Sequence, residues 1–261
     1  MAISNAQRGI QSIEVGGALL KALAHHGRAL PLKDLAAEAG MTPAKAHPYL
    51  VSFGKLGLIE QDAGSGRYGL GPLAMQLGLI SLQQLDPLAL ATPLLEPLAA
   101  EIGHTVAVAV WGNRGATIVR IAQPPGAVFV SMRHGTVMSL RGTASGRLFA
   151  AWMPAAQVRP VLRTELRADR GLRESATDWA AALQAIRVDG LSGARDLLLP
   201  GISALAAPVF DGNGTLVLSL TTIGTTAGLD TARDGVPARV LQAAARGLSA
   251  QLGARARSGP A

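Results

Sequence analysis

Apolar side chains recur at helical spacing in the first 60 residues. Residues 12–24 place Leu19 and Leu23 on one face, which predicts an amphipathic helix. A second, shorter helical segment covers residues 31–40 and closes at Gly40, a residue type that tolerates the left-handed backbone found just after many helices. The pattern therefore predicts two short helices in succession.

A third helix is predicted from residue 43 onward. The Thr42 hydroxyl can accept a hydrogen bond from a first-turn amide, and Pro43 suits the first helical position. The helical pattern continues until Gly54 or Gly57. Thr42 and Pro43 thus mark where the third helix begins.

Two strands are predicted next, at residues 58–61 and 67–70, with a small flexible tip at 62–66 between them. A helix, two helices joined by a turn and then a hairpin are typical of a winged helix-turn-helix. Residues 1–71 are therefore predicted to form such a domain.

Residues 71–103 are again helical in pattern, with interruptions at Asp86-Pro87 and Thr92-Pro93. An apolar stripe runs along this segment, larger than a small winged domain needs for its own core. Its members are Leu73, Leu77, Ile80 and Leu85. Residues 72–103 are interpreted as a linker, which packs either on a neighbouring part of the chain or on a second subunit.

Beyond residue 104 the pattern changes to strands interleaved with helices. The predicted elements are strands at 105–111, 116–121 and 127–132, helices from about Thr143, at 155–166 and at 178–188, a hairpin of 202–210 and 215–222, and a closing helix at 237–252. Adjacent strands joined by tight turns favour an antiparallel sheet. Residues 104–253 are therefore predicted to form an α+β domain, a sheet with helices beside it, followed by a tail at 254–261.

The composition excludes several kinds of site. The 261 residues contain no cysteine, which excludes disulfides, thiolate metal ligands and cysteine nucleophiles. None of the five histidines has the i, i+4 spacing of a helical metal pair, and no cofactor is expected. Aromatic residues, at 3%, are too few for a surface that stacks RNA bases.

The net charge of +7 favours a polyanionic partner such as DNA. The excess is spread over both parts of the chain, so charge alone does not locate the DNA-contacting face. The N-terminus lacks the pattern of a secretory signal, and no apolar stretch reaches the ~18 residues of a membrane span. A cytoplasmic protein without a membrane partner is expected.

Six segments of the chain together resemble IclR-type bacterial transcriptional regulators. They are residues 9–14, 42–47, 57–61, 67–71, 143–147 and 201–211, and the resemblance spans about residues 8–253. It implies a winged-helix DNA-binding domain, a helical linker that dimerises and a GAF-like effector-sensing domain. Such proteins act as homodimers or dimers of dimers on a palindromic operator in double-stranded DNA.

In a helix-turn-helix, the second helix meets base edges in the major groove with its N-terminal residues. The DNA-binding candidates are Arg8, Lys33, Thr42, Pro43, Ala44, Lys45, His47, Tyr49, Ser65 and Arg67. Tyr49 has two readings, a core ring or a phosphate contact through its hydroxyl. Ser65 and Arg67 belong to the wing, where small residues let the backbone approach a phosphate and arginine supplies charge.

Pro48 departs from the family pattern, which commonly has arginine there. Proline lacks an N–H and clashes with the carbonyl of Ala44, so either the third helix is kinked or its regular part begins after residue 47. We expect Pro48→Arg to strengthen DNA binding, because it restores an N–H and adds a cation.

A ligand site is predicted in the second domain. The helix start at Gly142, Thr143, Ala144 and Ser145 offers free amides to a carboxylate. The resemblance assigns the pocket wall to Ile202, Ala204, Thr221 and Ile223 and to the loop 193–196. Arg195 in that loop either points inward toward an anionic effector or is a solvated charge. A small organic acid with a compact apolar body is the predicted effector.

Two other functions stay open. A small-molecule enzyme is one, although the sequence lacks a Gly-x-Ser-x-Gly motif, a dinucleotide-binding glycine motif and a phosphate-binding loop. The other is a small-molecule-binding protein whose DNA binding is weakened or lost through Pro48. Neither alternative changes the predicted fold.

Overall fold

The computed structural model describes residues 9–124, 132–168 and 174–254. They form two compact units that follow one another in the sequence, the first ending at Leu85 and the second beginning at Asp86. The predicted strand at 127–132 falls almost wholly outside the described residues, as do Arg8 and the end of the tail.

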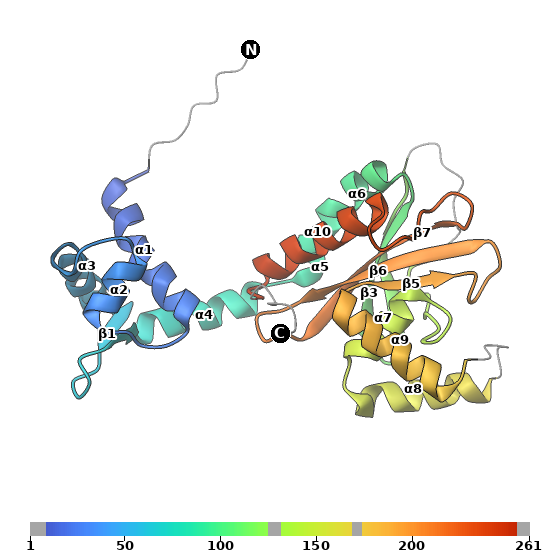
Figure 1. Ribbon diagram of the computed structural model, residues 1–261, viewed down its shortest axis with the longest axis horizontal. Helices are drawn as coiled ribbons and strands as arrows, with labels where there is room; N and C mark the ends of the chain where they lie inside the picture. Colours follow the sequence, from blue (N-terminus) through green and yellow to red (C-terminus); the bar gives the residue numbers. More distant parts are fainter. Residues whose placement is uncertain (1–8, 125–131, 169–173, 255–261) are drawn as a thin grey trace, which may run out of the picture. The chain divides into compact units, whose positions relative to one another are not determined.

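The first unit has the predicted order of helices and hairpin (Figure 1). Its elements are α1 (Gln11–His26), α2 (Leu32–Glu38), α3 (Pro43–Lys55), β1 (Ile59–Gln61), β2 (Tyr68–Leu70) and α4 (Pro72–Gln84). Leu19, Leu35 and Leu50, one from each of the first three helices, are buried in one core. The winged helix-turn-helix is confirmed.

The turn between α2 and α3 is built by the two residues that the sequence singles out. Gly40 has a left-handed backbone with φ of 67°, and the amide of Met41 bonds to the Ala36 carbonyl at 2.9 Å. Thr42 caps α3, since its Oγ1 accepts from the amide of Lys45 at 3.3 Å. These contacts fix where α3 begins.

Pro48 lies inside α3, which is continuous from Pro43 to Lys55. The alternative that the regular helix begins only after residue 47 is therefore wrong. The buried side of α3 is formed by Ala46 and Leu50, whereas Pro48 is exposed. The proline ring therefore lies at the surface of the helix and displaces no core residue.

The wing is extended by a third segment. Leu30 and Tyr68 exchange backbone hydrogen bonds of 2.9 and 2.8 Å, so residue 30 pairs with β2 on its other side from β1. Tyr68 is buried in the core of the unit. The hairpin is thus attached to the helices by pairing as well as by packing.

Helix α4 is apolar and uncharged, and most of it is exposed. No residue from 71 to 85 carries a charge, yet Met75 is 68% exposed and Ile80 is 41% exposed. The helix is held at its start, where the amide of Leu73 bonds to the Gly57 carbonyl at 2.9 Å. Leu77 and Ile80 of the predicted stripe are therefore exposed, whereas Leu73 and Leu85 at its ends are half-buried.

The second unit contains a five-stranded antiparallel sheet in the order β4-β3-β7-β6-β5. Its strands are β3 (Thr105–Gly112), β4 (Gly115–Ala122), β5 (Ser192–Arg195), β6 (Ile202–Phe210) and β7 (Leu216–Thr225). Its helices are α5 (Pro87–Ala91), the 3-10 helix η1 (Thr92–Leu94), α6 (Leu95–Ile102), α7 (Ala144–Trp152), α8 (Ala155–Arg167), α9 (Ala176–Asp189) and α10 (Val236–Gln251).

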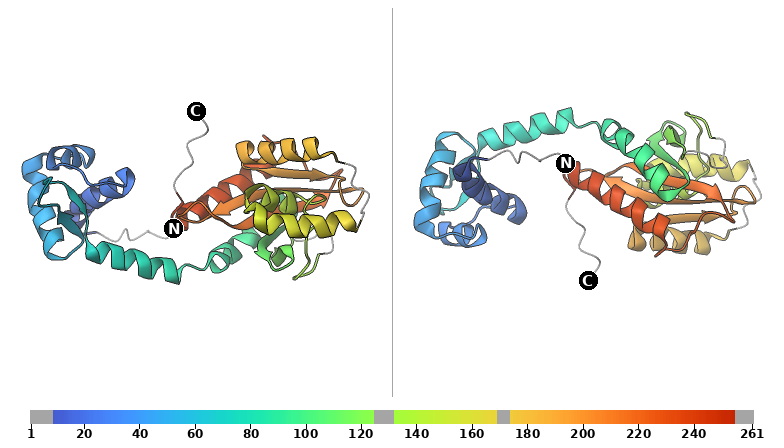
Figure 2. Two further views of the ribbon diagram at one scale, coloured as in Figure 1. Left: turned by 90° about the horizontal axis from the view of Figure 1, so that it is seen from below. Right: turned by 90° about the horizontal axis from the view of Figure 1, so that it is seen from above.

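Helices cover both faces of this sheet (Figures 1 and 2). Helices α6 and α10 pack on one face, and α7, backed by α9, packs on the other. The predicted α+β class with an antiparallel sheet is confirmed, and the sheet forms the middle of three layers because helices pack on both of its faces. Residues 144–151 of α7 are all buried, because that helix lies between the sheet and α9.

One predicted loop is a strand. Residues 193–196 were expected to form a loop, but Ser192–Arg195 is the edge strand β5, in which Ala194 pairs with Ala204 of β6. A four-residue strand with a glycine and an arginine has too little hydrophobic alternation to be recognised alone. Its partner β6 supplies the hydrogen bonds that define it.

Candidate functional site

The N-terminal half of α3 presents an exposed surface. Thr42, Pro43, Ala44, Lys45 and His47 are all exposed, as predicted for residues that meet DNA. Ala46 between them is buried in the core and anchors the helix. The ammonium group of Lys45 and the imidazole ring of His47 are thereby available to an external partner.

Tyr49 is half-buried and packs against the core of the first unit. A side chain at Gly16 of α1 would come within 2.8 Å of the Tyr49 ring, so α1 and α3 approach closely there. Of the two readings of Tyr49, the structure favours the core ring.

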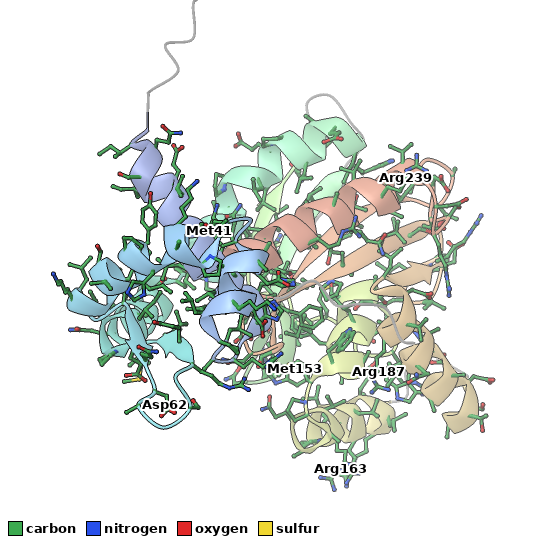
Figure 3. All side chains as sticks on the ribbon, turned by 60° about the vertical axis from the view of Figure 1, so that its left-hand side comes forward. Met41, Asp62, Met153, Arg163, Arg187 and Arg239 are labelled. Carbon is green, nitrogen blue, oxygen red and sulfur yellow. The ribbon has the colours of Figure 1, made fainter. Side chains whose placement is uncertain are left out.

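The tip of the wing is organised by Asp62 (Figure 3). Its carboxylate accepts hydrogen bonds from the Ser65 hydroxyl at 2.6 Å and the Ser65 amide at 2.7 Å, which lower the pKa of Asp62. The Ser65 amide and hydroxyl are therefore bonded within the tip, and the expected approach of the wing backbone to a phosphate stays a prediction. Arg67 is exposed beside this tip, and Lys33 is exposed on α2.

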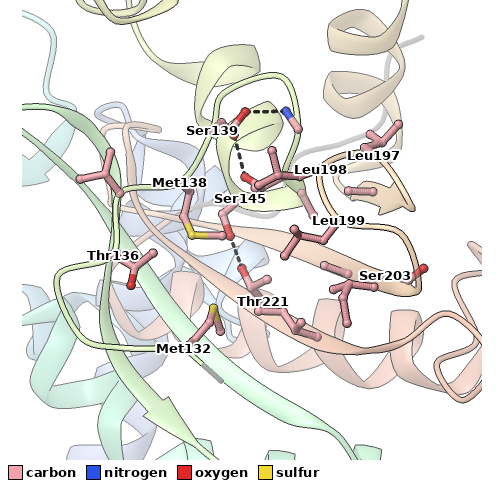
Figure 4. Close-up of a pocket in the computed structure, with 18 residues that line it drawn as sticks. Met132, Thr136, Met138, Ser139, Ser145, Leu197, Leu198, Leu199, Ser203 and Thr221 are labelled. Atoms are coloured by element: carbon pink, nitrogen blue, oxygen red, sulfur yellow. Dashed lines mark hydrogen bonds between the residues drawn. The ribbon is translucent and has the colours of Figure 1, made fainter. Parts of the chain in front are cut away.

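The second unit contains a cavity of about 220 Å³ between the start of α7, the sheet and two loops (Figure 4). It is lined by Met132, Thr136, Val137, Met138, Ser139, Gly142, Thr143, Ala144, Ser145, Ala194, Leu197, Leu198, Leu199, Ile202, Ser203, Ala204, Thr221 and Ile223. Of the residues predicted for the pocket, Gly193, Arg195 and Asp196 do not line it, and all the others do.

Arg195 does not point into the cavity. Its side chain is 69% exposed, and its Nε lies 4.0 Å from the Asp196 carboxylate. Successive residues of a strand face opposite sides of the sheet, and here Ala194 takes the inward position. Of the two readings of Arg195, the solvated charge is correct, and the described lining contains no charged side chain.

The first residues of α7 line this cavity and have amides that the helix itself does not use. Thr143 is the N-cap, because its Oγ1 accepts from the Gly146 amide at 3.0 Å. The amides of Thr143, Ala144 and Ser145 make no hydrogen bond within the described part of the chain. The Ser145 hydroxyl is bonded to Thr221 Oγ1 at 2.8 Å rather than to a histidine, so it is not arranged as a nucleophile.

Two loops that line the cavity were missed from the sequence, one leading into α7 and the other joining β5 to β6. The first contributes Met138 and Ser139, and the second contributes Leu197 to Leu199. Three consecutive leucines before Pro200-Gly201, in a segment too short for a helix, were an available signal. The methionines gave none, since they are isolated in sequence.

Glu165 of α8 fixes the loop that leads into α7. Its carboxylate accepts from the amides of Leu140 at 2.7 Å and Arg141 at 3.2 Å, and from the Ser139 hydroxyl. Ser139 Oγ in turn accepts from the Gly142 amide at 2.8 Å. This network holds one wall of the cavity, and no spacing in the sequence connects its members.

A buried ion pair ties α7 to the segment that leads into α9. The Arg147 guanidinium lies 2.5 Å from the Glu174 carboxylate and 5.2 Å from the centre of the Trp179 ring. Burial lowers the pKa of Arg147, and the Glu174 charge acts in the opposite direction. The pair lies outside the cavity and has a structural role.

Asp196 closes the loop that carries the three leucines. It has a left-handed backbone, with φ of 53°, and its carboxylate accepts from Thr226 Oγ1 and the Gly201 amide, both at 2.7 Å. These bonds, the Thr226 one first, lower the pKa of Asp196. The carboxylate thus joins the two ends of the loop.

Over the described ranges, no cluster of three or more histidine, aspartate or glutamate side chains could hold a metal ion. The same part of the chain has no helix with the length and apolar character needed to cross a membrane.

Comparison with known proteins decides the family. A model of the IclR helix-turn-helix domain matches residues 12–63, and a model of the bacterial transcriptional regulator IclR C-terminal domain matches residues 80–250. This chain belongs to the IclR family. Its matched regions fall on the helix-turn-helix and on the sheet domain with its cavity.

Members of the IclR family with similar sequences include two glycerol operon regulatory proteins. That of Streptomyces coelicolor is 31% identical over 78% of this chain and 80% of its own length, and that of Streptomyces griseus is 30% identical over 94% and 96%. The crystal structure of Pseudomonas aeruginosa HmgR has 37% identity and a TM-score of 0.88, covering 94% of this chain and 99% of that one.

This IclR-family chain is therefore a DNA-binding transcriptional regulator with a C-terminal effector domain. The family and these relatives are regulators and not enzymes, so the enzyme hypothesis is set aside. DNA is the partner of the first unit, and regulators of this family act as oligomers.

Proposed function

We propose that the second unit of this regulator binds a small organic acid and that the acid changes the affinity of the first unit for its operator. One observation carries the proposal. Three residues at the start of α7, whose amides have no hydrogen-bond partner within the described part of the chain, line a cavity whose described lining has apolar and hydroxyl groups but no charge. A carboxylate is the ligand group that such a helix start favours.

The physical terms agree with an acid of small size. Amide donors and the positive end of a helix stabilise an anion by up to ~2 kcal/mol where partly buried. Leucine, isoleucine and methionine walls stabilise an apolar body by about 25 cal/mol per Å² of area removed from water. An apolar cavity of roughly 150 Å³ admits benzene, so about 220 Å³ suits one small ring or short chain with an acidic end.

We further propose that the chain acts in the cytoplasm as a homodimer or dimer of dimers on double-stranded DNA. The uncharged, exposed helix α4 is the segment that a second subunit covers best. In this proposal residues 1–71 bind DNA, residues 72–103 link the domains and dimerise, and residues 104–253 bind the effector. The GAF-like character of residues 104–253 stays an expectation from the resemblance.

A thermal-shift panel tests the effector class, because a ligand that binds only the folded protein raises its melting temperature. The panel contains aromatic acids, keto acids, the amides of both, and sugars. Glycerol is included because two relatives are glycerol operon regulatory proteins. The proposal predicts that at least one acid stabilises the protein and that its amide does not. Stabilisation by amides as strong as by acids, or by sugars and glycerol alone, contradicts it.

The alternative is a protein that binds the small molecule but whose DNA binding was weakened or lost through Pro48. The unbroken α3 with its Thr42 cap counts against it. A gel shift with the DNA upstream of the protein's own gene distinguishes the two, since only the regulator retards that fragment.

A further inference from the structure

An apolar stripe lies on the exposed face of α3. Ala44, Pro48 and Val51 are exposed and lie at i, i+4 and i+7, hence on one side of the helix. Val51 is 44% exposed, while Ala46 and Leu50 on the other side are buried. The stripe therefore lies on the side of α3 that is turned away from the core.

None of these three side chains can donate a hydrogen bond. Pro48 also has no N–H, so the Ala44 carbonyl lacks the donor that a regular helix places four residues further on. Ala44 and Pro48 are both exposed, so this acceptor lies beside the proline ring at the surface. This part of α3 presents hydrocarbon and a backbone acceptor to its partner.

The major-groove edges of the base pairs carry only one methyl group, the C5-methyl of thymine. Guanine presents two acceptors there, O6 and N7, which need donors such as arginine or lysine. An apolar ring matches the thymine methyl group, and a carbonyl oxygen beside it can accept from the N6 amine of the paired adenine but not from the acceptors of guanine. Lys45, His47 and Lys55 flank the stripe and are free to contact phosphates.

We infer that Pro48, supported by Ala44 and Val51, is a specificity-determining residue that contacts a thymine methyl group in each half-site of the operator. The inference rests on the proposed function, since it requires that α3 enters the major groove. It also revises the interpretation of Pro48→Arg. The added cation raises affinity for DNA of any sequence, but the thymine preference is lost.

The experiment selects duplexes from a random library with the full-length protein and then replaces each selected thymine with deoxyuridine, which removes only the methyl group. For the wild type, one symmetric thymine is expected at which the replacement weakens binding about fourfold, equivalent to ~0.8 kcal/mol for one methyl group. In Pro48→Ala, which restores the N–H and removes the ring, this effect is expected to fall below about 1.5-fold.

Leu56→Ala is the matched control, because Leu56 is an exposed apolar residue of the same unit beyond the end of α3. It is expected to keep the fourfold effect. A wild-type protein that selects no sequence overturns both the proposed function and this inference. If the protein selects specific sequences but no deoxyuridine replacement has an effect that depends on residue 48, the inference alone is overturned. A preference for guanine that Pro48→Ala abolishes also overturns it.

Discussion

Two arginines of the second unit show what residue type does and does not reveal. Arg195 invited an inward reading because it lies in a segment assigned to the pocket, yet it is solvated, since the strand that contains it turns Ala194 inward. Arg147 attracted no notice and is buried against Glu174. The direction of the Arg195 side chain is set by the pairing of β5 with β6, and the burial of Arg147 is set by the packing of α9 on α7. Neither contact can be inferred from the spacing of nearby residues in the sequence.

Other site residues could be predicted, because local geometry decides them. Thr143 caps α7 as its position before a helical run suggests. Thr221 and Ile223 share a face because strand residues alternate. Glu165 could not be found in this way, since its contacts with residues 139–141 join segments far apart in sequence.

Removing the carboxylate of Glu174 leaves the Arg147 guanidinium buried without its counter-charge. Glu174→Ala is therefore expected to lower the free energy of unfolding by about 3 kcal/mol. Glu96→Ala, which removes an exposed carboxylate of α6, is the control. Chemical denaturation measures both variants, and equal, small losses would show that the pair is not structural.

Lys45 and Arg67 are predicted phosphate contacts. Removing each charge is expected to weaken binding to all duplexes and to reduce the slope of log affinity against log salt by about one unit, hence by about two in Lys45→Ala/Arg67→Ala. Arg163→Ala in the second unit is a control of equal charge loss. Titrations at several salt concentrations measure the slopes, and an unchanged slope in the double variant removes these residues from the interface.

At the scale of elements, the sequence predicts best where periodicity is long. The helices of the first unit and the hairpin of β6 and β7 stand where predicted, because capping residues and an Asp-Gly-Asn-Gly turn punctuate them. The edge strand β5 and the loop with three leucines were missed. Both owe their conformation to partners, β6 for the strand and Asp196 for the loop.

The closure of that loop by Asp196 predicts a pH dependence. The pKa of the carboxyl is lowered below its ordinary value of 3.8, so its charge stabilises the fold above that pH and the contribution is lost as the pH falls through the lowered pKa. Asp196→Asn keeps a residue type that tolerates φ of 53° but removes the charge.

Melting temperatures of the wild type and Asp196→Asn, measured from pH 7 to below pH 3, check this. The wild type is expected to melt higher near neutral pH, and the difference is expected to shrink at the acidic end. A difference that stays constant or grows on acidification means that the charge is not what closes the loop.

Helix α4 predicts how the subunits associate. Its exposed apolar residues form an uncharged surface of the kind that a second subunit buries. Because Ile80→Asp places a charge on that surface, the variant is expected to shift the proposed dimer toward the monomer and to weaken binding to a palindromic operator. Gln76→Asp adds the same charge at an exposed polar position of the same helix. Light scattering on both variants gives the mass, and a dimer in Ile80→Asp excludes this helix as the interface.

At the scale of the whole molecule, DNA contact and ligand binding lie in separate compact units. A ligand in the cavity can influence DNA only through a coupling free energy between the units, for which 1–3 kcal/mol is typical. The residues next to the division at Leu85, α4 and α5, are the covalent route for that coupling. Regulation therefore requires this coupling free energy in addition to binding of the ligand in the cavity.

The most direct test of the regulatory proposal is fluorescence anisotropy of a labelled upstream DNA fragment, titrated with full-length protein with and without the organic acid that raises its melting temperature. We expect the protein to bind the fragment specifically. We also expect the acid to change the affinity for the fragment at least about fivefold, corresponding to a coupling free energy near 1 kcal/mol. The amide of the same acid is expected to leave the affinity unchanged. Equal affinities with and without a saturating acid would contradict the account.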